Sequence, residues 1–232
     1  MLLAFVLLIP GQFHAGDVAW GVAAGAAGLL GIVLLYRGLA TGAMAIVAPI
    51  TAVTAALVPM IVGLVLEVTP SALALAGVGC AVIAIALVSL GPRGGQVTAG
   101  IIGLSLTAGA MFGIFFALLA QTHDNSGMWP LVAVRLTSIP LGLLIVVRRG
   151  MSLRLERPIL PWVLFAGLGD IGANALFLLA AREGLLSIVA PIAALYPVST
   201  VLLALAIDKE RVRPVQIAGL GLAATALVLT AV

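Results

Sequence analysis

A five-residue sequence occurs twice in this chain and constrains its fold more than any other feature. Ile-Val-Ala-Pro-Ile occupies residues 46–50 and again residues 188–192. Each copy lies early in a long apolar run, so its proline, Pro49 or Pro191, removes one helix hydrogen bond and kinks the helix. In lipid, such a break is tolerated only where it faces packed protein or a watery cavity. Its occurrence at matching places in two halves predicts a binding site between two repeats, as in secondary transporters.

The composition excludes a soluble globular protein. Hydrophobic residues make up 63% of the 232 residues and charged residues only 8%, whereas soluble domains carry about 25% charged residues. We therefore predict an all-α protein that crosses the lipid bilayer many times. The net charge of +3 comes from a few basic residues that lie mostly between the apolar runs, so it does not indicate nucleic acid as a partner. The single cysteine, Cys80, lies in an apolar run, where we expect a small packed side chain.

Windows of about 20 apolar residues mark the membrane spans. Eight complete spans are predicted, at residues 18–36, 43–65, 72–90, 98–120, 128–147, 160–180, 184–206 and 214–232. Residues 1–10 are also apolar, but as a helix they cover only about 15 Å of a hydrocarbon core about 30 Å thick. They also lack the basic start of a signal peptide. We expect them to be the end of a ninth span whose beginning is absent.

The two copies belong to a longer repeat. The residue numbers of Pro49 and Pro191 differ by 142, and we call this difference the repeat offset. Without gaps, the same offset pairs Trp20 with Trp162, Gly25 with Gly167, Gly42 with Gly184, Gly77 with Gly219 and Gly79 with Gly221. We predict two repeats, at residues 1–92 and 98–232, the first lacking one span and most of a second. The intact architecture would be five plus five spans, and an odd number per repeat gives the halves opposite membrane orientations.

Four short motifs in the second half are shared with one family of membrane proteins. They are Gly184-Leu-Leu-Ser-Ile-Val-Ala-Pro191-Ile with Leu195-Tyr196-Pro197-Val-Ser-Thr200-Val, then Asp208-Lys209-Glu210-Arg211, Gln216-Ile-Ala-Gly219 and Arg135. In that order, they resemble the ninth helix, a Gly-Glu-Arg loop, the start of the tenth helix and the seventh-helix arginine of EamA-type transporters in the drug/metabolite transporter superfamily.

The resemblance covers the chain from about residue 18 onward and implies a fold and a function. It implies ten helices in two inverted repeats, in a multi-pass protein of the plasma membrane that moves small metabolites, often outward, through a central cavity. Set against the family pattern, the chain is expected to lack the first helix and most of the second. The first-repeat loop, residues 66–70, also lacks the family's arginine, and residues 10–17 contain no lysine or arginine.

Asp170 and Asn174 are the most informative polar residues within the spans. They lie four residues apart, so they share one helix face. A carboxylate in the hydrocarbon region costs at least about 2.5 kcal/mol unless it is paired or wetted. One hypothesis places both on a cavity wall, with Asp170 binding a proton or a substrate cation. The alternative is a structural ion pair with Arg135, which could itself bind a substrate anion or reach the interface.

Polar side chains also follow each proline of the repeated sequence. Tyr196 and Thr200 lie one turn apart after Pro191, and Pro197 adds a second break between them. Thr51 and Thr54 occupy the comparable stretch after Pro49. We predict a hydrogen-bonding substrate wall, with Pro49, Pro191 and Pro197 as kink and gating positions. The alternative is bonding between helices, worth about 1 kcal/mol or less per bond.

No metal or cofactor is predicted. His14 and His123 lie in short loops without metal-like partners, and both are expected to be solvated. The partners we predict are the lipid bilayer and a small-molecule substrate. Coupling to a proton gradient and assembly as a homodimer are further hypotheses.

The basic residues give a conflicting indication of membrane orientation. Counting loops alternately, one side receives Arg37, Arg93, Arg148, Arg149, Arg154, Arg157, Lys209, Arg211 and Arg213. The other side receives only Arg182. Basic loops favour the cytoplasm, which places the C-terminus outside it. The resemblance implies the opposite, with both termini in the cytoplasm, and the two expectations stay open.

The leading functional hypothesis is a secondary transporter that alternates access between its two repeats. The sequence contains no Gly-x-x-x-x-Gly-Lys loop, so an ion gradient is the expected drive. A second hypothesis is a truncated subunit or fragment that does not transport. A remote third is an intramembrane aspartyl protease, because Gly167-Leu-Gly169-Asp170 matches the Gly-x-Gly-Asp sequence of that class. That chemistry needs two carboxylates sharing a proton, and we find no second one inside another span.

Overall fold

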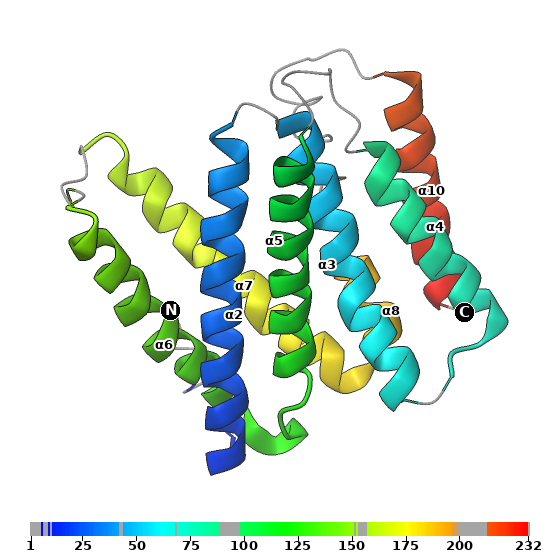
Figure 1. The fold of residues 1–232 in the computed structure, drawn as a ribbon. Coiled ribbons are helices and arrows are strands. Elements are labelled where there is room, and N and C mark those ends of the chain that lie inside the picture. Colours follow the sequence, from blue (N-terminus) through cyan, green and yellow to red (C-terminus); the bar gives the residue numbers. More distant parts are fainter. Residues whose placement is uncertain are drawn as a thin grey trace. The chain divides into compact units, whose positions relative to one another are not determined.

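The computed structural model describes residues 6, 9, 11–41, 44–67, 69–88, 98–150, 152, 157–196, 198 and 213–231. Within these residues lie eight α-helices, one short 3-10 helix and no strand (Figure 1). The helices are α2 (Ala15–Leu39), α3 (Met44–Leu66), α4 (Ala72–Val88), α5 (Ala99–Leu119), η1 (Asp124–Ser126), α6 (Trp129–Arg148), α7 (Leu160–Glu183), α8 (Leu186–Ala193) and α10 (Pro214–Ala231). The predicted all-α fold is confirmed.

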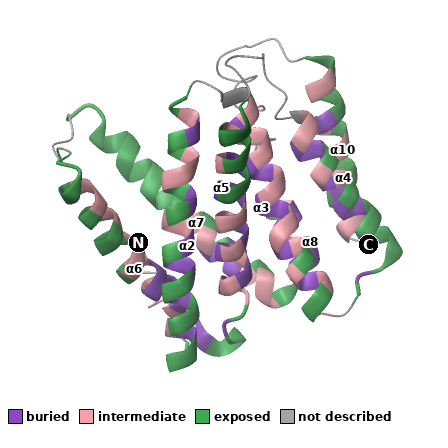
Figure 2. Ribbon diagram, in the orientation of Figure 1, coloured by how far each residue is buried: buried purple, intermediate pink, exposed green. Residues whose placement is uncertain are grey.

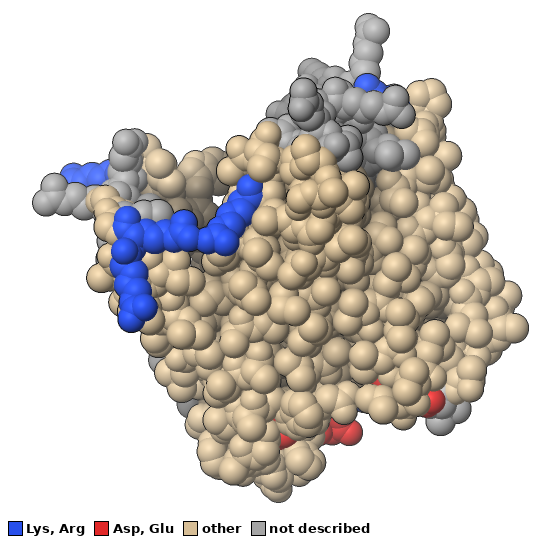
Figure 3. Space-filling model, viewed as in Figure 1, with Lys and Arg blue, Asp and Glu red and all other residues tan. Residues whose placement is uncertain are grey.

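Most of these helices have the length and composition of membrane spans. Five of them, α2, α3, α5, α6 and α7, are long and apolar enough to cross a bilayer, and α4 and α10 are shorter apolar helices. The α8 helix ends at Ala193, and most of the later residues of the predicted span 184–206 lie outside the described part. On the face in Figure 3, most of the described residues are other than Lys, Arg, Asp and Glu. The chain is therefore a polytopic membrane protein.

The helix ends follow from local sequence. At the start of α4, the hydroxyl of Ser71 accepts a hydrogen bond from the backbone N–H three residues later (3.1 Å). Thr98 does the same at the start of α5 (3.3 Å), and both residue types are favoured helix caps. The α10 helix begins with Pro214, whose fixed φ suits a first helical position. After α6, Gly150 has a φ of 64°, which is typical of the glycine that follows a helix.

The chain divides into two compact units, each built from separate segments. Unit 1 comprises residues 1–29 and 118–183, and unit 2 comprises residues 30–117 and 184–232. Each unit therefore combines helices from both sequence repeats. The two units are groups of helices that touch, whereas the repeats are segments of similar sequence. The predicted repeat boundaries therefore stay a prediction.

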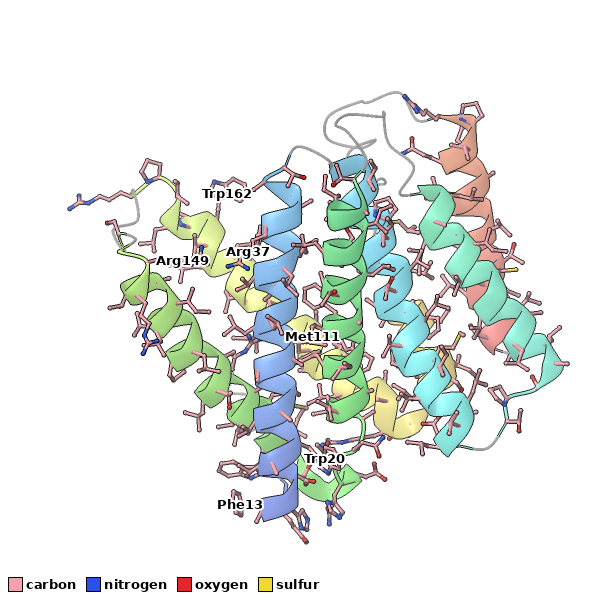
Figure 4. All side chains as sticks on the ribbon, viewed as in Figure 1. Phe13, Trp20, Arg37, Met111, Arg149 and Trp162 are labelled. Carbon is pink, nitrogen blue, oxygen red and sulfur yellow. The ribbon has the colours of Figure 1, made fainter. Side chains whose placement is uncertain are left out.

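Helix positions follow the sequence repeat. The α8 helix begins at Leu186, which the repeat offset relates to the start of α3 at Met44. The α10 helix begins at Pro214, which the same offset relates to the start of α4 at Ala72. The α2 and α7 helices are likewise related, and their matched tryptophans, Trp20 and Trp162, are both exposed (Figure 4). Exposed tryptophans near helix ends are typical of membrane interfaces.

Within unit 2, repeat-related helices pack against each other and run in opposite directions. The α4 and α10 helices lie side by side (Figure 1). A Cβ added to Gly77, early in α4, would lie 2.8 Å from the side chain of Thr230, at the end of α10. The end of α3 lies at the start of α8, because a Cβ added to Gly63 would lie 2.4 Å from the backbone nitrogen of Ser187. Both pairs are therefore antiparallel.

The buried cluster of unit 2 is composed of repeat-related residues. It contains nine buried residues and five partly buried ones. Twelve of these fourteen form six pairs related by the repeat offset: Ala52 with Ala194, Val53 with Leu195, Ala56 with Val198, Cys80 with Leu222, Ala81 with Ala223, and Ala84 with Ala226. A two-fold relation between the antiparallel helices explains why both members of each pair reach the same core.

The α3 and α5 helices of unit 2 meet at a glycine. A Cβ added to Gly109 would lie 2.6 Å from the backbone oxygen of Thr51 and 2.6 Å from the Cβ of Thr54. Helices in lipid gain little from the hydrophobic effect and depend on such close backbone contact. Gly103, on the same helix, has no heavy atom within 4 Å of the corresponding position.

Gly109→Ala is therefore expected to lower the free energy of unfolding by about 1–3 kcal/mol, because the extra methyl group forces α3 and α5 apart. Thermal or denaturant unfolding in detergent measures the change. Gly103→Ala is the matched control and should leave stability unchanged or slightly raised, since alanine favours the helix by about 1 kcal/mol. Equal effects of the two substitutions would contradict the packing described here.

Candidate functional site

Three polar side chains meet between α6 and α7 in unit 1. Arg135 of α6 donates a hydrogen bond from its guanidinium to Oδ2 of Asp170 on α7. Asn174 lies one turn beyond Asp170 and donates its amide to the backbone oxygen (2.8 Å) and to Oδ1 (3.2 Å) of that residue. The shared face of Asp170 and Asn174 and the pairing with Arg135, both suggested by the sequence, are thus present. We call these three residues the polar triad.

Close contact between α2 and α6 positions the arginine of the polar triad. A Cβ added to Gly25 of α2 would lie 2.6 Å from the backbone oxygen of Val134, the residue immediately before Arg135. One turn earlier, a Cβ added to Gly21 would lie 2.6 Å from the backbone oxygen of Pro130. The two glycines therefore allow the α2 backbone to press against α6 directly beside the arginine.

The depth and exposure of Asp170 bear on what the triad can do. Asp170 lies near the middle of α7, and its side chain is 54% exposed, whereas that of Arg135 is 25% exposed. Residues 157–170, which include the first half of α7, are exposed (Figure 2). A charge near the bilayer centre is costly unless it is paired or wetted. The guanidinium supplies the pairing, and the exposed part of the carboxylate can still take a proton, a cation or a hydrogen-bond donor.

The hydroxyl groups of the first-repeat threonines are already engaged. Thr51 is buried and donates a hydrogen bond to the backbone oxygen of Ser105 on α5 (3.2 Å). Thr54 donates to the backbone oxygen of Ile50, one turn earlier in α3 (2.7 Å). These contacts match the alternative of bonding within and between helices. A role of the two threonines in substrate binding stays a prediction.

The second-repeat residues are only partly described. Tyr196 is 52% exposed, whereas Thr200 and Pro197 lie outside the described residues. Pro191 is buried within α8, and that helix ends two residues later, at Ala193. The α3 helix instead continues through Pro49, which is partly buried, to Leu66. Neither proline is exposed on the surface, and their predicted gating role stays a prediction.

A second polar cluster, at the start of α2, was not predicted. Asp17 is fully buried, and its Oδ1 accepts a hydrogen bond from the backbone N–H of His123 (3.2 Å) and lies 2.9 Å from its ring Nδ1. The ring of His14 stacks on that of His123 with 4.7 Å between centroids. Arg182, at the end of α7, donates to Oγ of Ser126 (2.8 Å). The expectation of solvated histidines therefore holds for the ring of His123, which is 64% exposed, but both rings also have protein partners.

Local sequence carries little signal for these contacts. Asp17 and His123 are 106 residues apart. A further carboxylate, that of Glu67, accepts a hydrogen bond from the backbone N–H of Leu186, 119 residues away. An acidic residue at a span end is common, so only the tertiary structure distinguishes a buried, bonded one from a solvated one. The one available hint was the position of Asp17 in the first turn of a helix, where a carboxylate is favoured.

The comparison with known families decides the class of protein. The model of the EamA-like transporter family matches residues 99–232, which is more than half of the chain. The chain belongs to the EamA-like transporter family. This EamA-like transporter is an integral membrane protein of the drug/metabolite transporter superfamily, as the motifs of the second half suggested. No curated protein matches its sequence.

Membership of this family makes a transported small molecule and the lipid bilayer its partners.

The contacts of Asp170 also bear on the protease hypothesis. Among the described residues, the recorded hydrogen-bond partners of the Asp170 side chain are a guanidinium and an amide. An aspartyl protease instead needs a second carboxylate beside the first.

The contact between Arg135 and Asp170 should appear as a coupling energy. In a double-mutant cycle with Arg135→Gln and Asp170→Asn, we expect the two effects on the free energy of unfolding to be non-additive by about 0.5–3 kcal/mol. Denaturant unfolding in detergent micelles measures each variant. The control cycle pairs Arg135→Gln with Glu183→Gln, at the end of α7, and should be additive within about 0.5 kcal/mol. An additive Arg135–Asp170 cycle would show that the ion pair does not form.

Proposed function

We propose that this EamA-like transporter is a secondary active transporter that exports small metabolites, such as amino acids or drugs, by alternating access between two inverted repeats. The repeats are residues 1–92 and 98–232. The antiparallel packing of α3 on α8 and of α4 on α10 supports this proposal, because helices related by an inverted repeat must run in opposite directions.

The polar triad is the observation that carries the proposal. A charged pair in the middle of a membrane helix, with half of the carboxylate side chain exposed, needs water or a ligand to lower its free energy. In a transporter, that requirement is met by a solvent-filled cavity at the bilayer midplane. Asp170 and Asn174 are then the substrate or ion ligands, and Arg135 balances the charge when no ligand is bound. Tyr196, Thr200, Thr51 and Thr54 are further candidates for contacts with the substrate.

A proton gradient across the plasma membrane is the drive that we propose, with Asp170 as the proton-binding residue. The carboxylate can alternate between pairing with Arg135 and carrying a proton, which would couple its ionisation to the position of α7 relative to α6. The absence of a Gly-x-x-x-x-Gly-Lys loop from the sequence supports an ion gradient over direct use of ATP.

Asp170→Asn is expected to lower transport about tenfold or more, because it removes a charge-assisted hydrogen bond worth about 1.5–3 kcal/mol while keeping the shape of the side chain. The remaining transport should not depend on pH between about 5 and 8. Export of ethidium and of radiolabelled amino acids from cells or proteoliposomes is the assay.

The Arg135→Leu/Asp170→Leu double variant separates binding from structure. Within a membrane span, apolar residues are favoured over charged ones, so a purely structural pair predicts a folded double variant that transports normally. The proposal predicts a folded double variant that does not transport, while the control Glu183→Gln keeps wild-type transport. Wild-type transport and pH dependence in Asp170→Asn would refute the role of the polar triad.

A further inference from the structure

A carboxylate from the end of α3 caps the start of α8. Oε1 of Glu67 accepts a hydrogen bond from the backbone N–H of Leu186 (3.0 Å), and Oε2 lies 3.5 Å from the backbone nitrogen of Ser187. The residue at the cap position of α8, Leu185, supplies no side-chain hydrogen bond. The first N–H groups of a helix have no partner within the helix and carry a partial positive charge. Glu67 therefore replaces the missing local cap with a charged one from another helix.

The backbones of the two helices also touch at this point. A Cβ added to Gly63 would lie 2.4 Å from the backbone nitrogen of Ser187 and 3.0 Å from Oε2 of Glu67. The side chain of Ser187 is buried, with 1% of the residue exposed, and its hydroxyl has no hydrogen-bond partner among the described residues. The contact between the end of α3 and the start of α8, which we call the α3–α8 seam, is therefore tightly closed.

We infer that Glu67 is a gating residue, which holds the α3–α8 seam closed in the conformation described here. The inference rests on the proposed alternating access, since α3 and α8 are the proline-containing helices of the two repeats. Opening the α3–α8 seam requires the start of α8 to move away from Gly63. The same movement separates the Glu67 carboxylate from the backbone N–H groups of Leu186 and Ser187. The free energy of that capping contact therefore sets part of the balance between the closed and open states.

We call the contact of the Glu67 carboxylate with the first N–H groups of α8 the carboxylate latch. The repeat offset relates Glu67 to Lys209, which lies outside the described residues.

Labelling of Ser187 with a membrane-impermeant maleimide tests the latch without a transport assay. Ser187→Cys is introduced into the full chain after Cys80→Ala removes the native thiol. We expect slow labelling with Glu67 present and a rate about tenfold higher with Glu67→Ala. Loss of the helix cap should raise the population of the open seam by about that factor. Glu67→Gln keeps one accepting oxygen and should give an intermediate rate, provided that both variants keep the wild-type unfolding midpoint.

Glu183→Ala is the matched control, because it removes an exposed carboxylate three residues before α8 and should leave the rate unchanged. An equal labelling rate with and without the Glu67 carboxylate would overturn the inference, as would an equal increase with Glu183→Ala. If the labelling results hold but the wild-type chain transports no substrate, the proposed function fails while the latch remains.

Discussion

Close approach of helix backbones is the interaction on which this structure depends. Burying apolar side chains stabilises helix pairs little in a bilayer, because lipid is equally apolar, so association relies on packing at small residues. The core of unit 2 follows this rule, since alanine supplies seven of its nine buried residues, and Gly63 and Gly77 lie where repeat-related helices meet. The same small residues allow either helix of a pair to shift, which a transporter requires.

Charged groups within this apolar frame are few, and their positions are correspondingly informative. Asp170 is paired in the middle of a span by Arg135, whereas Glu67 is placed at the end of one helix and the start of another. The first arrangement suits a ligand that competes for the carboxylate. The second suits a contact that is made in one conformation and broken in another. In the proposed mechanism, the two carboxylates act at different steps, Asp170 in binding and Glu67 in gating.

Much of the fold was predictable from the sequence because the bilayer restricts the choices. Apolar windows predicted every described α-helix within a few residues, apart from the C-terminal end of α8, since each span must satisfy its own backbone hydrogen bonds. The repeat offset predicted which helices are related, and the four-residue spacing placed Asp170 and Asn174 on one face. The pairing of related helices with each other was not predicted, because a repeat in sequence does not specify which helices touch.

The contacts that sequence reasoning missed are those between distant segments. Asp17 and Glu67 looked like ordinary span-end carboxylates, and their partners lie far away along the chain. Thr51 is a polar residue in an apolar span, which suggested a cavity wall, but its hydroxyl donates a hydrogen bond to the backbone of α5. In each case a side chain could have faced water, another helix or a ligand, and only the packing distinguishes these environments.

Disulfide cross-linking between α4 and α10 tests the inverted arrangement most directly. In a Cys80→Ala chain, the antiparallel arrangement predicts rapid cross-linking of Gly77→Cys with Leu229→Cys. A Cβ added at residue 77 would lie 2.9 Å from that of Leu229, so a slight separation of the two helices gives the about 3.5–4.5 Å that a disulfide needs. The pair Gly77→Cys with Gly219→Cys, which are related by the repeat, should stay reduced. Cross-linking of residues 77 and 219 in place of 77 and 229 would mean that the related helices run parallel, and it would contradict an inverted-repeat transporter.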